Sequence, residues 1–254
     1  MKYVRFVLLV CFSLLCIGTF YYTLSYFEQR KPVRTPIKVI AQTGSIKEGL
    51  KTDFLAELLD LSVDNPKHLS TEEVEEILER SPLIKKVSAS YLNSETLYVD
   101  YTLRHPVFAL IDIENAALDL EGYLFPLNPY FTPKKLPELY LGLKEIILFG
   151  ESLQGKEMAL ATELYHLLKG EINRIDLSHI NESSLGKKEI VVVLELPNSS
   201  ARHILRLSTK RYQEELHDYQ ALQSTVQGGD FIIDLRVSDL AYVTQLKDDT
   251  IYQK

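Results

Sequence analysis

The sequence is poor in several residue types, and each absence narrows the classes of protein to consider. Its 254 residues include no tryptophan and only two cysteines, Cys11 and Cys16. Two cysteines are too few for a disulfide scaffold. The chain also lacks a basic excess, because 28 Lys and Arg residues are outweighed by 35 Asp and Glu residues, which gives a net charge of −7. A general nucleic-acid binder needs a basic surface, so that class is excluded.

Little in the sequence points to catalysis. The six histidines are scattered, without the spacings of metal-binding motifs, and no GxSxG elbow is present. Residues 150–157 (GESLQGKE) resemble a phosphate-binding loop, but Glu157 replaces the magnesium-binding hydroxyl and Glu151 adds another negative charge. We interpret them as a strand-to-helix turn, and we predict no catalytic residue, metal, cofactor or small-molecule substrate. An enzyme whose acid and base residues lie far apart in sequence is an alternative.

Hydrophobic residues make up 46% of the chain, and its longest uncharged run is the 22 residues Phe6–Phe27. A helix of this length spans about 33 Å, enough for a hydrocarbon core of about 30 Å. We therefore predict a transmembrane helix in contact with the lipid bilayer. A cleaved signal peptide is the alternative, but its apolar core is usually about 7–15 residues long and ends in small residues. Here the run ends in tyrosines and phenylalanine.

The flanking charges predict the orientation of this helix. Lys2 and Arg5 favour a cytoplasmic N-terminus, whereas a long remainder crosses the membrane largely regardless of its charge. Without these two residues, 26 basic and 35 acidic residues remain, a net charge of −9. Beyond the apolar run the chain has no cysteine, which suits an exported domain, although a cysteine-free cytosolic domain is possible too.

Residues 37–101 predict a small α+β unit. Ile37–Ala41 alternate like a strand, and Thr52-Asp53 can cap a short helix. Ser70 or Thr71 can cap a second helix, which has acidic residues in its first turn and one apolar face. Two alternating strands follow, 87–91 and 97–101. The order strand, helix, helix, strand, strand predicts a sheet with two helices on one face.

The rest of the chain predicts a second α+β unit that is richer in strands. A turn at Glu121-Gly122 predicts a hairpin, and four prolines predict an irregular segment over 126–137. An amphipathic helix is predicted over 154–168, and a further helix over 210–226. The predicted strands are 107–111, 145–149, 172–177, 189–196, 203–207, 231–237 and 240–243.

Several local motifs, taken in order, resemble one known family. They are residues 37–44 (IKVIAQTG), 81–87 (SPLIKKV), 94–99 (SETLYV), 104–109 (RHPVFA), 118–125 (LDLEGYLF), 136–139 (LPEL), 233–237 (IDLRV) and 240–243 (LAYV). Together with the short tail and the single apolar run, they resemble the FtsQ/DivIB family of bacterial cell-division proteins. The resemblance implies a polypeptide-transport-associated (POTRA) domain followed by a β-rich domain.

The resemblance also implies a domain layout. The expected parts are a cytoplasmic tail (1–5), the transmembrane helix (6–27), a linker (28–36), the POTRA domain (37–106), the β domain (107–246) and a C-terminal tail (247–254). The expected location is the bacterial inner membrane at the division septum, with both domains in the periplasm.

The function that the resemblance implies is that of a non-enzymatic, membrane-anchored scaffold of the division machinery. Its expected partners are small single-span coiled-coil proteins like FtsB and FtsL, and its expected role is to recruit and regulate septal peptidoglycan synthesis. The alternative is another anchored POTRA protein that acts as a chaperone-like module in export or secretion.

The candidate partner-binding residues lie in the last two predicted strands: Leu235, Arg236, Ala241, Tyr242 and Val243. A strand at the edge of a sheet can pair with an extended segment of a partner. Tyr242 is the expected anchor, because a tyrosine can bury its ring and keep its hydroxyl hydrogen-bonded. Ordinary core packing is the competing interpretation, and the alternation favours it for Leu235 and Val237.

Overall fold

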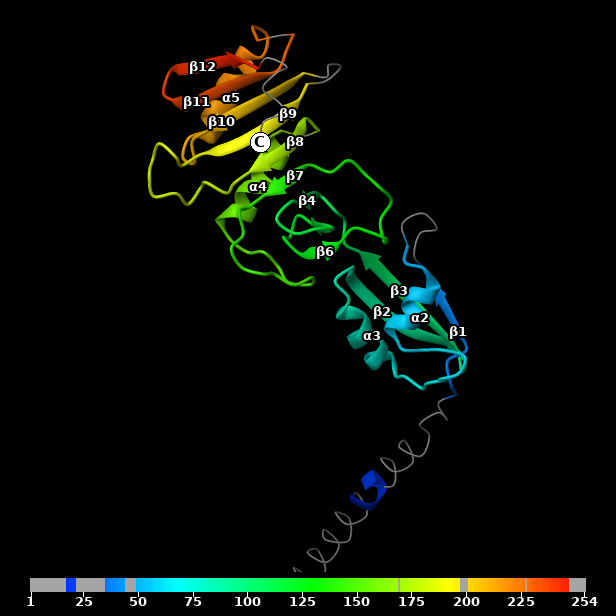
Figure 1. The fold of residues 1–254 in the computed structure, drawn as a ribbon. Coiled ribbons are helices and arrows are strands. Elements are labelled where there is room, and N and C mark those ends of the chain that lie inside the picture. Colours follow the sequence, from blue (N-terminus) through cyan, green and yellow to red (C-terminus); the bar gives the residue numbers. More distant parts are fainter. Residues whose placement is uncertain are drawn as a thin grey trace, which may run out of the picture.

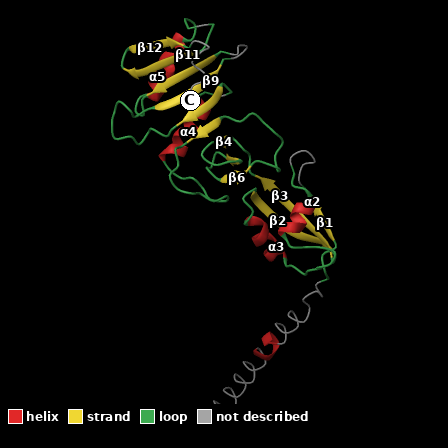
Figure 2. Ribbon diagram, in the orientation of Figure 1, coloured by secondary structure: helices red, strands yellow, loops and turns green. Residues whose placement is uncertain are grey.

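The computed structural model describes residues 17–21, 35–43, 49–168, 170–196, 201–226 and 228–246. From residue 35 onward they form two β-sheets that follow one another along the chain (Figure 1), and each sheet has helices packed on it. Figure 2 shows the same elements coloured by type. Strands and helices are labelled below as in Figure 1.

The first sheet has three strands in the order β1-β3-β2. β1 (Val39–Gln42) runs parallel to β3 (Thr96–Leu103), which is antiparallel to β2 (Ile84–Asn93). The parallel pair needs a long crossover, and α2 (Thr52–Leu58) and α3 (Thr71–Glu79) lie in it. α3 begins with a capping box, because Ser70 accepts a hydrogen bond from the Glu73 N–H and the Glu73 carboxylate accepts one from the Ser70 N–H.

The second sheet is mixed, with nine strands in the order β12-β11-β10-β9-β8-β7-β4-β5-β6. α4 (Lys156–Leu167) connects the parallel strands β7 and β8, and α5 (Tyr212–Leu222) connects the parallel strands β10 and β11. The strands are β4 (Phe108–Leu110), β5 (Ala116–Leu118), β6 (Leu124–Pro126), β7 (Glu138–Tyr140), β8 (Ile172–Asp176), β9 (Ile190–Glu195), β10 (Arg202–Leu207), β11 (Phe231–Val237) and β12 (Leu240–Gln245).

α4 and α5 cover one face of this sheet and bury its core. Alternate strand residues such as Val192, Leu205 and Ile233 pack with Leu164 of α4 and Leu216 of α5 in one buried cluster. The intervening residues, including Val193, Ile204 and Asp234, lie on the opposite face and stay partly exposed. We call that opposite side the open face.

The core of the first unit continues into the second sheet. Ala117 of β5 and Phe125 of β6 are completely buried in the same cluster as Leu97 and Val99 of β3. The Phe131 ring lies 5.6 Å from the Phe125 ring and packs against this cluster. The β5–β6 hairpin therefore supplies apolar side chains to both cores.

Polar contacts reinforce this joint between the two units. Arg104, which follows β3, donates to the Asp119 carboxylate at 2.9 Å, and both side chains are nearly buried. The same guanidinium lies 3.6 Å from the centroid of the Tyr123 ring. Asp119 also accepts hydrogen bonds from the Glu121 and Tyr123 N–H groups, which fixes the hairpin turn.

The structure does not show the predicted transmembrane helix. Of Phe6–Phe27 it describes only residues 17–21, whose single helical stretch is about 7.5 Å long. Within the described part of the chain, no helix combines the length and the apolar character needed to cross a membrane. The predicted fold class is corrected to α+β with a three-stranded and a nine-stranded sheet. The predicted tails 1–5 and 247–254, most of the linker 28–36 and the rest of the apolar run lie outside the described residues.

The strand predicted for residues 145–149 is also wrong, since this segment forms neither strand nor helix. The short strand β7 was not predicted from the sequence. It lies between β4 and β8, so both edges of β7 are already paired. The neighbouring Leu143 N–H donates to the Asp112 carboxylate, and the Leu148 N–H donates to the Glu151 carboxylate. Strand propensity without a free neighbouring strand is not enough to form a sheet.

Candidate protein-binding edge

The two ends of the nine-stranded sheet differ in how they meet solvent. At one end, residues 150–153 run along β6: the Leu124 N–H donates to the Glu151 carbonyl at 3.0 Å, and the Gly150 N–H donates to the Leu124 carbonyl at 2.8 Å. At the other end, β12 pairs with β11 and with no second strand of the described chain. One end of the sheet is therefore covered, and the β12 end is open as far as the described residues reach.

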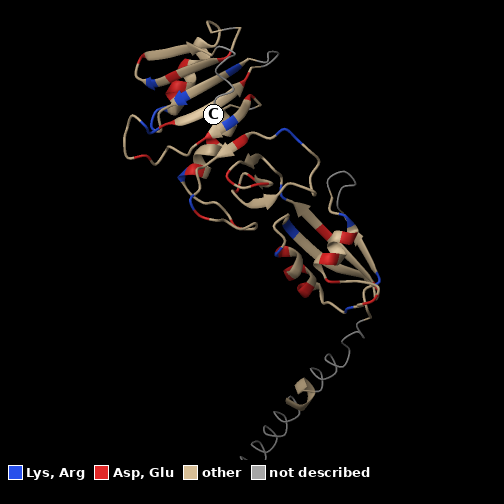
Figure 3. Ribbon diagram, viewed as in Figure 1, with Lys and Arg blue, Asp and Glu red and all other residues tan. Residues whose placement is uncertain are grey.

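β12 has neither charges nor prolines to protect it as an edge strand, although a β-bulge in β11 shapes its start. Its sequence, LAYVTQ, contains no charged residue, and the strand has no Lys, Arg, Asp or Glu colour along its length in Figure 3. Natural sheets commonly protect their edges with charges, prolines or covering segments. A six-residue edge with none of these suits pairing with another chain.

The pairing of β12 with β11 decides which backbone groups face outward. The Leu246 N–H donates to the Asp230 carbonyl at 2.8 Å, and the register then alternates so that Thr244 and Tyr242 also bond toward β11. The N–H and C=O of Val243 therefore point away from the sheet and are open to a further strand.

A β-bulge shapes the start of β12. Between the pairs Asp234–Tyr242 and Val237–Leu240, two residues of β11 lie opposite the single residue Ala241. The extra residue shifts the alternation, so Leu235 is buried whereas Val237 is half-exposed. The interpretation as core packing is thus confirmed for Leu235 and wrong for Val237.

The five candidate residues fall into three groups. Tyr242 and Val243 are exposed over 63% and 43% of their surface and lie on opposite faces of the edge strand. Leu235 belongs to the buried core, and Ala241 packs partly against it. Arg236 is mostly buried in ion pairs on the open face. The edge itself therefore presents Tyr242 and Val243, with Leu240 beside them.

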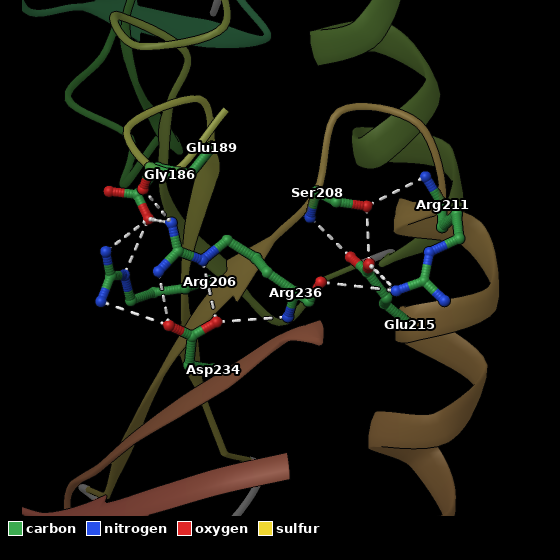
Figure 4. A network of polar contacts seen from close by, with 8 residues as sticks. All are labelled: Gly186, Glu189, Arg206, Ser208, Arg211, Glu215, Asp234 and Arg236. Atoms are coloured by element: carbon green, nitrogen blue, oxygen red, sulfur yellow. Dashed lines mark hydrogen bonds and ion pairs between the residues drawn. The ribbon is translucent and has the colours of Figure 1, made fainter. Parts of the chain in front are cut away.

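Arg236 belongs to a balanced network of two arginines and two carboxylates (Figure 4). It contacts Asp234 at 2.7 Å and Glu189 at 3.0 Å, and Arg206 contacts the same two residues at 3.3 and 2.7 Å. Burial alone would raise the pKa of Asp234, but the hydrogen bonds and charge of Arg236 outweigh it and hold that pKa below its usual range. The hydrogen bonds to Asp234 in turn raise the pKa of Arg236. The network fixes β11 against β10 and the start of β9.

A second network holds β11 from the helix side. Glu215 of α5 is almost completely buried, and it accepts hydrogen bonds from the Ser208 N–H and hydroxyl at 2.6 Å each. The Arg211 guanidinium donates to Glu215 at 3.3 Å and to the Arg236 carbonyl at 3.4 Å (Figure 4). This carbonyl lies in the bulge, so the network stabilises the irregular part of the edge hairpin.

Beside this network, a groove of 380 Å³ lies between α5 and the β11–β12 hairpin. Leu235, Leu240 and Ala241 form its apolar lining. Carboxylates of Glu214 and Asp218 from α5 lie along it. The groove adjoins the edge strand on the face where Val243 lies.

His203 of β10 is a further buried titratable group, and it contacts α5 through Tyr219. Its Nδ1 lies 2.7 Å from the Tyr219 hydroxyl of α5, and no described residue hydrogen-bonds to its Nε2. The Phe231 ring packs edge-on at 5.8 Å. Burial lowers the pKa of His203, although the charge of Asp230 acts in the opposite direction.

We expect the fold to lose stability as the pH falls below about 6.5, the ordinary histidine pKa, because only the unfolded chain readily binds this proton. The loss from this one group is at most about 1.4 kcal/mol per pH unit. Asp230 and Asp234 have lowered pKa values, so their contributions disappear only at more acidic pH. Urea unfolding between about pH 7.5 and pH 5.5 measures the effect.

His203→Gln should lose this part of the pH dependence, whereas His217→Gln, at an exposed position of the same region, should retain it. An equally steep decline in both variants would contradict the assignment to His203.

Several residues that shape the edge were not predicted from the sequence. Nothing in the sequence distinguishes Glu189, Arg206 and Glu215 from ordinary surface charges, because their partners lie far from them along the chain. Asp234 could have been suspected, since it alternates with buried Ile233 and Leu235. The residues of the rejected phosphate-loop motif cover β6 with their backbone and lead into α4. No strand precedes them, so the predicted strand-to-helix turn is confirmed only on its helix side.

No protein-family model matches the sequence, and no curated protein is similar to it. Within the described residues, no group of three or more His, Cys, Asp or Glu side chains is placed to hold a metal ion. The functional argument therefore depends on the geometry of the edge.

Proposed function

We propose that this chain is a protein-binding scaffold that holds an extended segment of a partner along β12, in the cell-division role that its resemblance to FtsQ/DivIB implies. One observation carries the proposal: no described residue covers the uncharged β12 edge, whereas the β6 edge at the far end of the same sheet is covered. A protein that only avoided aggregation would protect both ends.

The mode of binding follows from the outward-facing backbone of β12. A partner strand would accept from and donate to the Val243 backbone, and its side chains would alternate between the two faces of the sheet. On one face they meet the Tyr242 ring beside Asp234. On the other they meet Val243 and the groove against α5. The partner segment is therefore expected to be extended and apolar, with few charges.

The two polar networks prepare the edge for this pairing. Glu189, Arg206, Asp234 and Arg236 hold β11 on the open face, and Glu215 with Arg211 holds it on the helix side. A strand fixed before binding loses less conformational freedom when the partner arrives. Arg236 then acts by positioning β11 rather than by direct contact. The candidate partners are small coiled-coil division proteins like FtsB and FtsL.

Two substitutions test the edge in different ways. Tyr242→Glu places a charge where an apolar contact is expected, and Val243→Pro removes the outward N–H without removing a hydrogen bond to β11. Both should weaken co-purification with the candidate partners at least about tenfold, or about 1.4 kcal/mol. Tyr140→Glu, on an interior strand of the open face, is the matched control and should bind normally.

Circular dichroism and thermal unfolding establish that each variant is folded. Normal partner binding by folded Val243→Pro and Tyr242→Glu chains would refute strand addition at β12. Loss of binding in the Tyr140→Glu control as well would point to the open face instead.

A further inference from the structure

The groove between α5 and the β11–β12 hairpin has an apolar floor. Leu235, Leu240 and Ala241 line its 380 Å³ from the hairpin, and Ala221 and Leu222 line it from α5. Leu240 is exposed over 50% of its surface, so the floor is accessible from outside. Apolar lining with a few polar groups is typical of sites that take up a ligand group. The floor therefore favours a ligand group that is apolar along its length.

The rim of the groove carries negative charge that the described part of the chain does not compensate. Glu214 and Asp218 lie one turn apart on α5, and Asp239 lies in the turn between β11 and β12. All three are exposed, and no cation of the described residues forms an ion pair with them. Glu215 and Arg211, the other charged residues of the groove, pair with each other at 3.3 Å. Like charges four residues apart destabilise a helix slightly, so the rim suits a bound cation.

The groove is continuous with the edge at which strand addition is proposed. In a pair of strands, side chains directly opposite each other lie on the same face, and every second residue returns to that face. Val243 has its backbone groups directed outward, and Ala241, two residues earlier, packs toward the core beneath α5. The partner residues opposite Val243 and opposite Ala241 would therefore both lie on the α5 side. The second of them would lie over the groove, because Ala241 is part of its lining.

We propose that the groove is a specificity site for one lysine or arginine side chain of the partner strand, at the position opposite Ala241. The aliphatic stem of that side chain would lie on Leu235 and Leu240, and its charged head would reach the carboxylates of the rim. A carboxylate at the same position would be repelled, and a short apolar side chain would leave the rim unpaired. This inference rests on the proposed function, because pairing at β12 places the cation.

Peptide display provides a probe for this site. A phage library of random peptides, long enough to pair with all of β12, is selected against the immobilised full chain in detergent. We expect binders with alternating apolar residues and one lysine or arginine. The strongest binder is then synthesised, together with a version in which glutamate replaces that cation. The wild-type chain should bind the cationic peptide at least about tenfold more tightly, and the difference should shrink at high salt, which screens exposed charges.

Charge reversal on α5 separates the groove from the edge strand. In a chain with both Glu214→Lys and Asp218→Lys, the preference should invert, so that the glutamate peptide binds more tightly than the cationic one. A chain with Glu57→Lys and Glu79→Lys is the matched control. These two exposed positions lie on helices of the first unit and change the net charge equally, so the wild-type preference should remain. Thermal unfolding establishes that both chains are folded.

The outcomes distinguish the specificity site from strand addition. Binders without a cation, or a preference that charge reversal leaves unchanged, would overturn the specificity site. If those binders still failed to bind the Val243→Pro chain, strand addition at β12 would stand without it. A cationic binder that Val243→Pro leaves unaffected would refute pairing at β12, and with it the position opposite Ala241. A library that yields no binder to the wild-type chain would overturn both.

Discussion

Phe125→Ala is expected to lower the free energy of unfolding by about 3–5 kcal/mol, and the loss should appear in the first unit as well as in the second. Phe125 belongs to β6 of the nine-stranded sheet, but its ring is completely buried in the core formed by α2, α3 and β3. Its removal leaves a cavity between the two units. Guanidinium unfolding of the full chain, followed by far-UV circular dichroism and by hydrogen exchange of β3 amides, measures the effect.

The control for this experiment is Phe149→Ala, because Phe149 is an exposed phenylalanine in the connection between β7 and α4. Its substitution should change stability by less than about 0.5 kcal/mol. If the β3 amides kept their protection in Phe125→Ala while only the second sheet lost stability, the shared core would be refuted.

Glu215→Ala is expected to destabilise the chain by about 2–4 kcal/mol, because it leaves buried polar groups without partners. The Ser208 N–H and hydroxyl lose their acceptor, and Arg211 loses its carboxylate. The bulge of β11 then loses the support that reaches it through the Arg236 carbonyl. Urea unfolding measures the stability, and partner co-purification measures the effect on β12.

Glu214 provides the matched control for the stability measurement, since it is the preceding residue of α5 but is exposed. Glu214→Ala should have an effect below about 0.5 kcal/mol. Equal destabilisation by the two substitutions would mean that α5 responds to helix propensity or charge rather than to the buried network.

The elements that could be predicted from the sequence are those whose signals are local. The capping box at Ser70 and Glu73, together with an apolar face, identifies α3 because all of its determinants lie within ten residues. β11 could be predicted in the same way, from the alternation of Ile233 and Leu235. Residues 145–149 show the limit of this reasoning, because they have a strand-like composition but no free neighbouring strand.

The features that define the binding edge depend on residues far apart in the chain. The sequence predicts that Asp234 and Arg236 belong to a strand. Glu189 and Arg206 form ion pairs with them only because of the order of the strands in the folded sheet. The covering of β6 by residues 150–153 likewise depends on where the connection to α4 crosses the sheet. A motif can indicate that β12 is the last strand, but only the sheet topology tells which end of the sheet is open.

The difference between the two ends of the nine-stranded sheet also sets a limit on assembly. Growth of a continuous intermolecular sheet requires each molecule to present two free edges, one to give and one to receive. Here residues 150–153 occupy one of them, so within the part of the chain that the structure describes this sheet can gain strands only at β12. Strand addition at β12 therefore gives one partner segment per chain and ends there. Pairing at β12 alone therefore does not extend this sheet from one molecule to the next.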